Sequence, residues 1–269
     1  MVRKLFKHEF LAYARVMSLV YIILLTMATV GRVIQFFEND SIVYTIVSVI
    51  ANITYSVSIF AAIAFCSVFT IVRFYKNLFT SEGYLSFTLP VTPSQHILVK
   101  SVTALSFDIL TWIVILISGC IITAGEMLTE IFKALGYIFR KLYELASFQS
   151  ILIGVEVLLL LLVLSVSGIL LYYLFIAIGQ LFKKNRILAA VGAYFVYYIL
   201  TQICSTIVLI VFSVFVSPEA LEAFGQFVLS HPYTSIHVGM CSLIVLSGIF
   251  SVIYFLVTKV IITKKLNLE

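Results

Sequence analysis

Residues 151–182 read ILIGVEVLLLLLVLSVSGILLYYLFIAIGQLF and contain a single charged side chain, that of Glu156. A helix needs about 20 consecutive apolar residues to cross the hydrocarbon core of a bilayer. The stretch exceeds that length and lacks the alternating pattern of a membrane β-barrel strand. Because lipid offers the backbone no hydrogen-bond partners, we predict a membrane-spanning helix here.

The rest of the chain has the same character. Of its 269 residues, 62% are hydrophobic and 11% are charged, whereas soluble proteins carry about 25% charged residues. The mean hydropathy is +1.18. We therefore predict an all-α, polytopic integral membrane protein that forms one transmembrane domain over residues 1–269. The six predicted membrane-spanning helices are 16–37, 42–72, 96–124, 151–182, 187–216 and 236–262.

The basic residues are distributed unevenly between the two ends of these helices. A cytoplasmic N-terminus places 13 of the 17 Lys and Arg residues on the inner side. The positive-inside rule then predicts that both termini are cytoplasmic. The net charge of +5 follows from this topology, so we expect no nucleic-acid partner.

Three segments outside the spans are also predicted to be helical. Residues 1–15 carry apolar and basic side chains on opposite faces, which favours an interfacial elbow helix on the inner surface over a simple basic flank. Residues 125–149 and 217–235 fall on the extracellular side. In the second of these, Ser217 is the expected N-cap and Pro218 the first helical residue.

The sequence contains none of the common catalytic or metal-binding motifs. It lacks a P-loop, an H-E-x-x-H motif, a G-x-S-x-G motif and any Cys/His cluster with metal-ligand spacing. The four cysteines all fall inside predicted spans. We expect no catalytic residue, no metal site and no cofactor in this chain.

Two carboxylates lie inside predicted spans, at Asp108 and Glu156. An ionisable group at such depth is costly and usually faces a cavity or a partner. Both residues are candidates for the lining of a translocation path or for a proton site. The alternatives are a hydrogen bond between helices and, for Glu156, a span boundary that is misplaced by one turn.

The largest polar stretch on the predicted inner side is residues 73–100, RFYKNLFTSEGYLSFTLPVTPSQHILVK. Thr80 or Ser81 as N-cap, with Glu82 in the first turn, predicts a short helix under the membrane. Ser94 is the predicted cap that restarts the next span after two prolines. The alternative is a well-capped turn between two spans.

The run NLFTSEGYLSFTLPVTP within this stretch resembles the first cytoplasmic loop of type-2 ABC transporter permeases from Gram-positive bacteria. The elbow helix, the six spans and the helical loop before the last span resemble the same family. In that family, the loop after the second span forms a coupling helix that docks into a separate ATP-binding cassette subunit. The resemblance implies a coupling loop at residues 73–95. The implied coupling residues are Phe79, Thr80, Ser81, Glu82, Gly83 and Tyr84.

The stretched segment 125–149 departs from the family, whose members have a tight turn there. We nevertheless expect the permease subunit of an ATP-driven exporter in the bacterial cell membrane. A partner ATPase would bind ATP and Mg²⁺, and a second permease copy or a paralogue would complete the transporter. Because few charges line the spans, the expected cargo is hydrophobic or amphipathic, such as a peptide or a drug-like molecule.

Two other functions fit the sequence. The first is an ion-coupled secondary transporter that uses Asp108 and Glu156. The second is a membrane anchor or sensor that transports nothing and recruits a partner through residues 73–100. Membrane lipid is a partner in all three cases.

Overall fold

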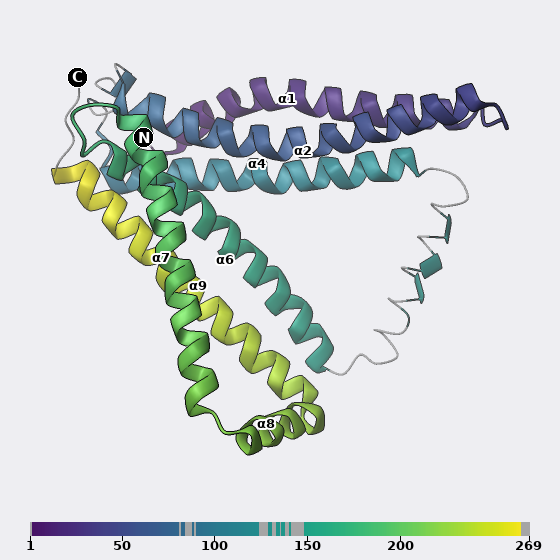
Figure 1. The fold of residues 1–269 in the computed structure, drawn as a ribbon. Helices are drawn as coiled ribbons and strands as arrows, with labels where there is room; N and C mark the ends of the chain where they lie inside the picture. Colours follow the sequence, from purple (N-terminus) through teal and green to yellow (C-terminus); the bar gives the residue numbers. More distant parts are fainter. Residues whose placement is uncertain are drawn as a thin grey trace. The chain divides into compact units, whose positions relative to one another are not determined.

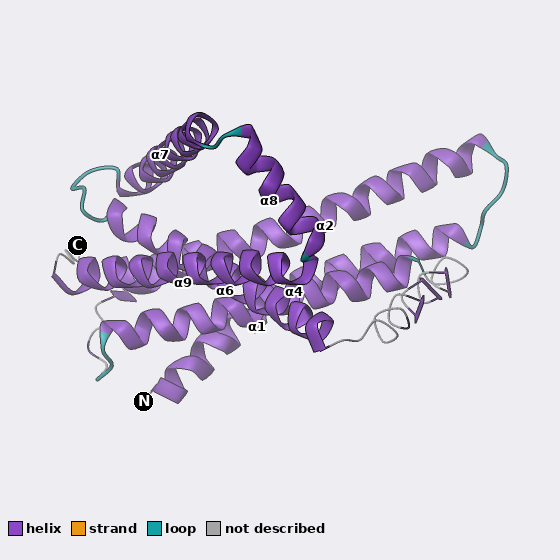
Figure 2. Cartoon of the chain, turned by 90° about the horizontal axis from the view of Figure 1, so that it is seen from below, coloured by secondary structure: helices purple, strands orange, loops and turns teal. Residues whose placement is uncertain are grey.

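The computed structural model describes residues 2–80, 82–83, 88, 90–123, 129–130, 133–134, 136–137, 140 and 148–264, without the side chains at 148 and 150 (Figure 1). The described elements are helices joined by loops (Figure 2). They are α1 (Val2–Gln35), α2 (Ile42–Phe79), α4 (Pro93–Ile122), α6 (Phe148–Gly179), α7 (Arg186–Phe215), α8 (Pro218–Ser230) and α9 (Pro232–Lys264). All but α8 contain a stretch long and apolar enough to cross a membrane. The predicted all-α fold with six candidate spans is confirmed, and it indicates a multi-pass membrane protein.

The chain divides into two compact units. The first unit comprises residues 1–78 and 82–145 and contains α1, α2 and α4. The second comprises residues 79–81 and 146–269 and contains α6, α7, α8 and α9. The prediction of a single transmembrane domain stays a prediction.

Helix α1 joins the predicted elbow at 1–15 and the predicted first span in one continuous helix. The physical reason is an unbroken stripe of buried side chains at intervals of three and four residues, which places them on one helix face. Neither Gly nor Pro interrupts the helix near residue 15. The stripe consists of Glu9, Tyr13, Met17, Tyr21, Leu24, Ala28 and Gly31.

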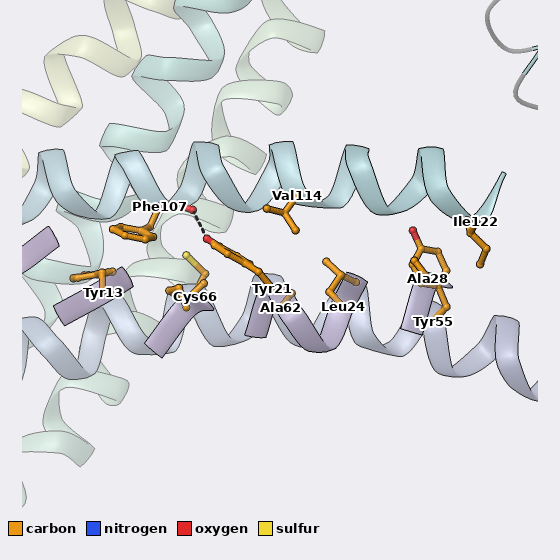
Figure 3. Close-up of a cluster of buried hydrophobic side chains, with 11 residues drawn as sticks. Tyr13, Tyr21, Leu24, Ala28, Tyr55, Ala62, Cys66, Phe107, Val114 and Ile122 are labelled. Carbon is orange, nitrogen blue, oxygen red and sulfur yellow. Dashed lines mark hydrogen bonds between the residues drawn. The ribbon is translucent and has the colours of Figure 1, made fainter. Parts of the chain in front are cut away.

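This stripe packs against α2 and α4 in the core of the first unit (Figure 3). Tyr13 stacks on Phe107 of α4, with ring centroids 5.2 Å apart. The hydroxyl of Tyr21 is 2.9 Å from the hydroxyl oxygen of Thr111 and donates to the carbonyl of Phe107. Because these polar atoms bond to one another, the core buries them without leaving a donor unpaired.

The approach of α1 to α4 depends on a small residue at the far end of the stripe. A Cβ atom at Gly31 would lie 3.0 Å from Cδ1 of Ile122. The backbones of α1 and α4 approach each other closely. In the sequence, by contrast, the neighbour of α1 is α2, which follows after a short connection. Side chains of α2, such as those of Tyr55 and Cys66, complete the cluster.

In the second unit, α6 packs along both α7 and α9. The ring of Phe175 in α6 meets the edges of Tyr194 and Tyr197 in α7. The hydroxyls of Tyr197 and Tyr254 lie 2.7 Å apart and join α7 to α9. The turn between α6 and α7 is tight, and Asn185 adopts a left-handed conformation there, with φ of 56°.

Helix α8 begins as the sequence predicts. Pro218 is in its first turn, and the hydroxyl oxygen of Ser217 accepts a hydrogen bond from the backbone N–H of Ala220. The predicted helical segment 217–235 is nevertheless divided, because α8 ends at Ser230 and α9 starts at Pro232. A proline is well tolerated at the first position of a helix, where its missing N–H is not needed.

The cap of α4 is Thr92, and the prediction of Ser94 is wrong. Thr92 accepts a hydrogen bond from the backbone of Gln95, whose side chain accepts one from the backbone N–H of Thr92. This reciprocal capping box satisfies two backbone donors, and Pro93 occupies the first helical turn. The predicted helix at 125–149 falls mostly outside the described residues, and those described at 129–130, 133–134, 136–137 and 140 are helical.

Candidate functional site at the ends of α2 and α4

Three helices of the first unit meet around the carboxylate of Glu9. Lys100 of α4 donates to Oε1 of Glu9 over 2.6 Å, and Asn77 of α2 donates to the same oxygen over 2.8 Å. Arg73 of α2 donates from Nε to Oε2 over 3.0 Å. One carboxylate therefore joins α1, α2 and α4, and we call these four residues the Glu9 cluster.

The local sequence explains how each member reaches the cluster. Glu9 is the first residue of the buried stripe of α1. Arg73 and Asn77 are four residues apart in α2 and so share one helix face. Lys100 lies in the second turn of α4, directly after the capping box at Thr92. The cluster thus combines the start of α1, the end of α2 and the start of α4.

Two of the three charged side chains in the cluster are buried. Glu9 is 5% exposed and Lys100 is 3% exposed, whereas the side chain of Arg73 is 27% exposed. The basic side chains of Arg73 and Lys100 share this one carboxylate. A buried charge is tolerated only when it is paired and hydrogen-bonded, so Glu9 is essential to the arrangement.

In the sequence, the predicted coupling residues begin at the last residue of α2 and precede α4. Phe79 is buried at the end of α2 and Thr80 follows it, half-buried. Glu82 is exposed and Gly83 is buried. Ser81 and Tyr84, also predicted as coupling residues, lie outside the described residues.

The predicted carboxylates of the spans belong to different units. Asp108 is half-buried in α4. Glu156 of α6 lies opposite His237 of α9, whose Nδ1 is 2.9 Å from both carboxylate oxygens. The thiol of Cys241 lies 3.7 Å from Oε1 of Glu156. For Glu156, the alternative of a hydrogen bond between helices is what the structure shows. A role of either residue in a translocation path stays a prediction.

Sequence reasoning missed all four residues of the Glu9 cluster, and His237, as site residues. A signal for Glu9 is present, because it is the one acidic residue of α1 and it shares a face with the apolar side chains of Leu5 and Tyr13. A lone carboxylate on the apolar face of a basic amphipathic helix predicts a buried partner. The identity of its partners depends on which helices pack together.

No group of three His, Cys, Asp or Glu side chains in the described part of the chain is placed to hold a metal ion. No protein-family model, curated protein or solved structure matches the chain. The interpretation of its function therefore depends on the residues and their geometry.

Proposed function

We propose that this chain is the membrane-spanning permease subunit of an ATP-driven ABC exporter. In this proposal, residues 73–95 contact a separate ATPase subunit, which binds ATP and Mg²⁺ and hydrolyses the nucleotide. The observation that carries the proposal is the Glu9 cluster. It ties together the two helices that the coupling segment connects and joins both to α1.

The cluster gives the coupling segment a defined mechanical connection. A displacement of the segment acts on the end of α2 and on the start of α4. Because Arg73, Asn77 and Lys100 all bond to Glu9, neither helix can move without moving the other or breaking buried ionic bonds. The displacement is therefore passed to α1 and its buried stripe. A packed bundle of this kind responds by switching between discrete arrangements.

The proposed mechanism is alternating access in a dimer of permeases. ATP binding closes two ATPase subunits, and the resulting motion of the coupling segments shifts the population between two permease states. The basic residues at this end, Arg73 and Lys100 among them, favour a cytoplasmic location by the positive-inside rule. The first turns of α1 then take the place of the elbow helix. Few charged side chains lie within the spans, which favours a hydrophobic or amphipathic cargo.

The test is reconstitution of the permease in liposomes with the ATPase that co-purifies with it. We expect ATP-dependent movement of a fluorescent amphipathic peptide. The changes Glu82→Ala and Gly83→Pro should leave ATP hydrolysis in place and lower transport per ATP. Glu219→Ala, an exposed acidic position on α8, is the matched control and should transport normally.

Two results would replace the proposal. Transport driven by a proton or sodium gradient without any ATPase would identify an ion-coupled carrier. Loss of partner binding in the Glu82 and Gly83 variants, with no cargo movement by the unmodified protein, would identify a membrane anchor or sensor.

A further inference from the structure

The contact between Glu156 and His237 places one acidic group opposite one imidazole in an apolar pair of helices. Glu156 is the only charged residue of α6. Its side chain is 15% exposed, and that of His237 is 22% exposed. The two helices that carry them, α6 and α9, pack closely along each other. Both side chains are therefore largely shielded within their unit.

The two nitrogens of His237 have different environments. Nδ1 faces both oxygens of Glu156. Nε2 is buried and bonds to no described group. When the imidazole is neutral and Nδ1 carries the hydrogen, Nδ1–H donates to the carboxylate and Nε2 presents a lone pair. The contact thus fixes the tautomer and leaves one basic atom open.

The charge of the pair depends on what this atom binds. With a neutral imidazole, the pair carries the full negative charge of Glu156, which is costly in an apolar span. One proton at Nε2 makes the pair neutral overall. This holds whether the hydrogen between Nδ1 and the carboxylate stays on nitrogen or moves to oxygen, because Nε2 is protonated in both cases.

We propose that the Glu156–His237 pair is a proton-binding site, with Nε2 of His237 as the atom that gains the proton and Glu156 as the residue that orients the ring and stabilises the added charge. Proton uptake changes the charge of the α6–α9 contact from negative to neutral. The contact between these helices then depends on pH.

Among the described residues of the second unit, other titratable groups lie on each of its helices. Cys241 of α9 is the described neighbour in contact with Glu156. Helix α7 has no charged residue beyond Arg186 at its start. On α8 the acidic residues are Glu219 and Glu222, both exposed. The capping residue His231 bonds through its ring to Ser230.

The proposal does not depend on ATP as the energy source and can be tested on the permease alone. Full-length protein with ¹⁵N-labelled histidine is placed in lipid nanodiscs, and imidazole signals are followed by NMR as the pH is changed. The signal of His237 is identified by its loss in His237→Gln. We expect this signal to report protonation of the His237 imidazole as the pH is lowered. Infrared bands of an ionised carboxylate should be present in the unmodified protein and absent in Glu156→Gln.

Removal of the carboxylate charge should lower the proton affinity of His237 about tenfold or more, since an opposite charge within 4–6 Å shifts a titration by about 1–3 pH units. Glu156→Asp keeps the charge and should restore most of the affinity, which also separates the effect from misfolding. Glu219→Gln is the control and should leave His237 unchanged. The proposal is overturned if Glu156→Gln and the unmodified protein protonate His237 alike, or if His237 stays neutral from about pH 5 to about pH 8.

Discussion

The change Glu9→Gln tests the Glu9 cluster most directly. It removes the one negative charge that Lys100 and Arg73 share, while the volume of the side chain is almost unchanged. Lys100 is 3% exposed, so its ammonium cannot turn to water instead. Removing one partner of a buried ion pair costs about 3–5 kcal/mol. We expect the free energy of unfolding to fall by about 3 kcal/mol. This is the lower end of that range, because the side chain of Arg73 is partly exposed.

The measurement is unfolding of the purified protein in detergent, combined with a double-mutant cycle. Lys100→Met alone should cost less than Glu9→Gln, because Glu9 keeps its bonds to Arg73 and Asn77. The double variant removes both buried charges, so Lys100 no longer leaves an unpaired ammonium, although Arg73 still loses its carboxylate partner. The loss in the double variant should therefore be smaller than the sum of the single losses by about 0.5–3 kcal/mol, the coupling found between residues in one ionic network.

Lys7→Gln provides the control, because Lys7 is an exposed cation on the same helix. It should change the unfolding free energy by no more than about 0.5 kcal/mol. If Glu9→Gln behaves like this control, or if the losses in the cycle simply add, then the three contacts at Glu9 do not stabilise the unit. In the reconstituted transporter, Glu9→Gln should also lower transport per ATP, and normal coupling in that variant would contradict the proposed route through α1.

Three further changes can be checked by thermal unfolding in the same detergent. Gly179→Ala would place a Cβ atom 2.6 Å from the carbonyl oxygen of Arg186 and should lower the free energy of unfolding by about 1–3 kcal/mol. Gly154→Ala, with open space around it, is the control and should be neutral or stabilise by up to about 1 kcal/mol. Equal effects of the two changes would refute the tight turn. Asn185→Gly should be tolerated at φ of 56°, while Asn185→Val should cost about 1–2 kcal/mol; the reverse order would contradict the left-handed conformation. Thr92→Ala removes the N-cap of α4 and should lower the free energy of unfolding by about 1 kcal/mol. Thr92→Ser should restore most of that stability. An alanine variant as stable as the unmodified protein would show that the cap is dispensable.

The sequence predicts the helices well, because each is a local feature. Long apolar runs locate the six candidate spans, and the Ser217–Pro218 pair locates the start of α8. The errors occur where two local signals compete. Both Thr92 and Ser94 can cap α4, and Thr92 is used because Gln95 three residues later completes the capping box. The continuous α1 is a related case, since a buried stripe extends across the boundary predicted at residue 15.

By itself, the sequence determines that the chain is helical and suited to a membrane, because apolar length and backbone hydrogen bonding leave no other arrangement in lipid. It also shows where the polar segment 73–95 and the two span carboxylates lie. Only the tertiary structure decides that Glu9 bonds to Lys100, 91 residues away, and that Glu156 meets His237, 81 residues away. The physical reason is that apolar helices can pack side by side in many ways with similar burial. The few polar side chains find partners only in the arrangement that the chain adopts.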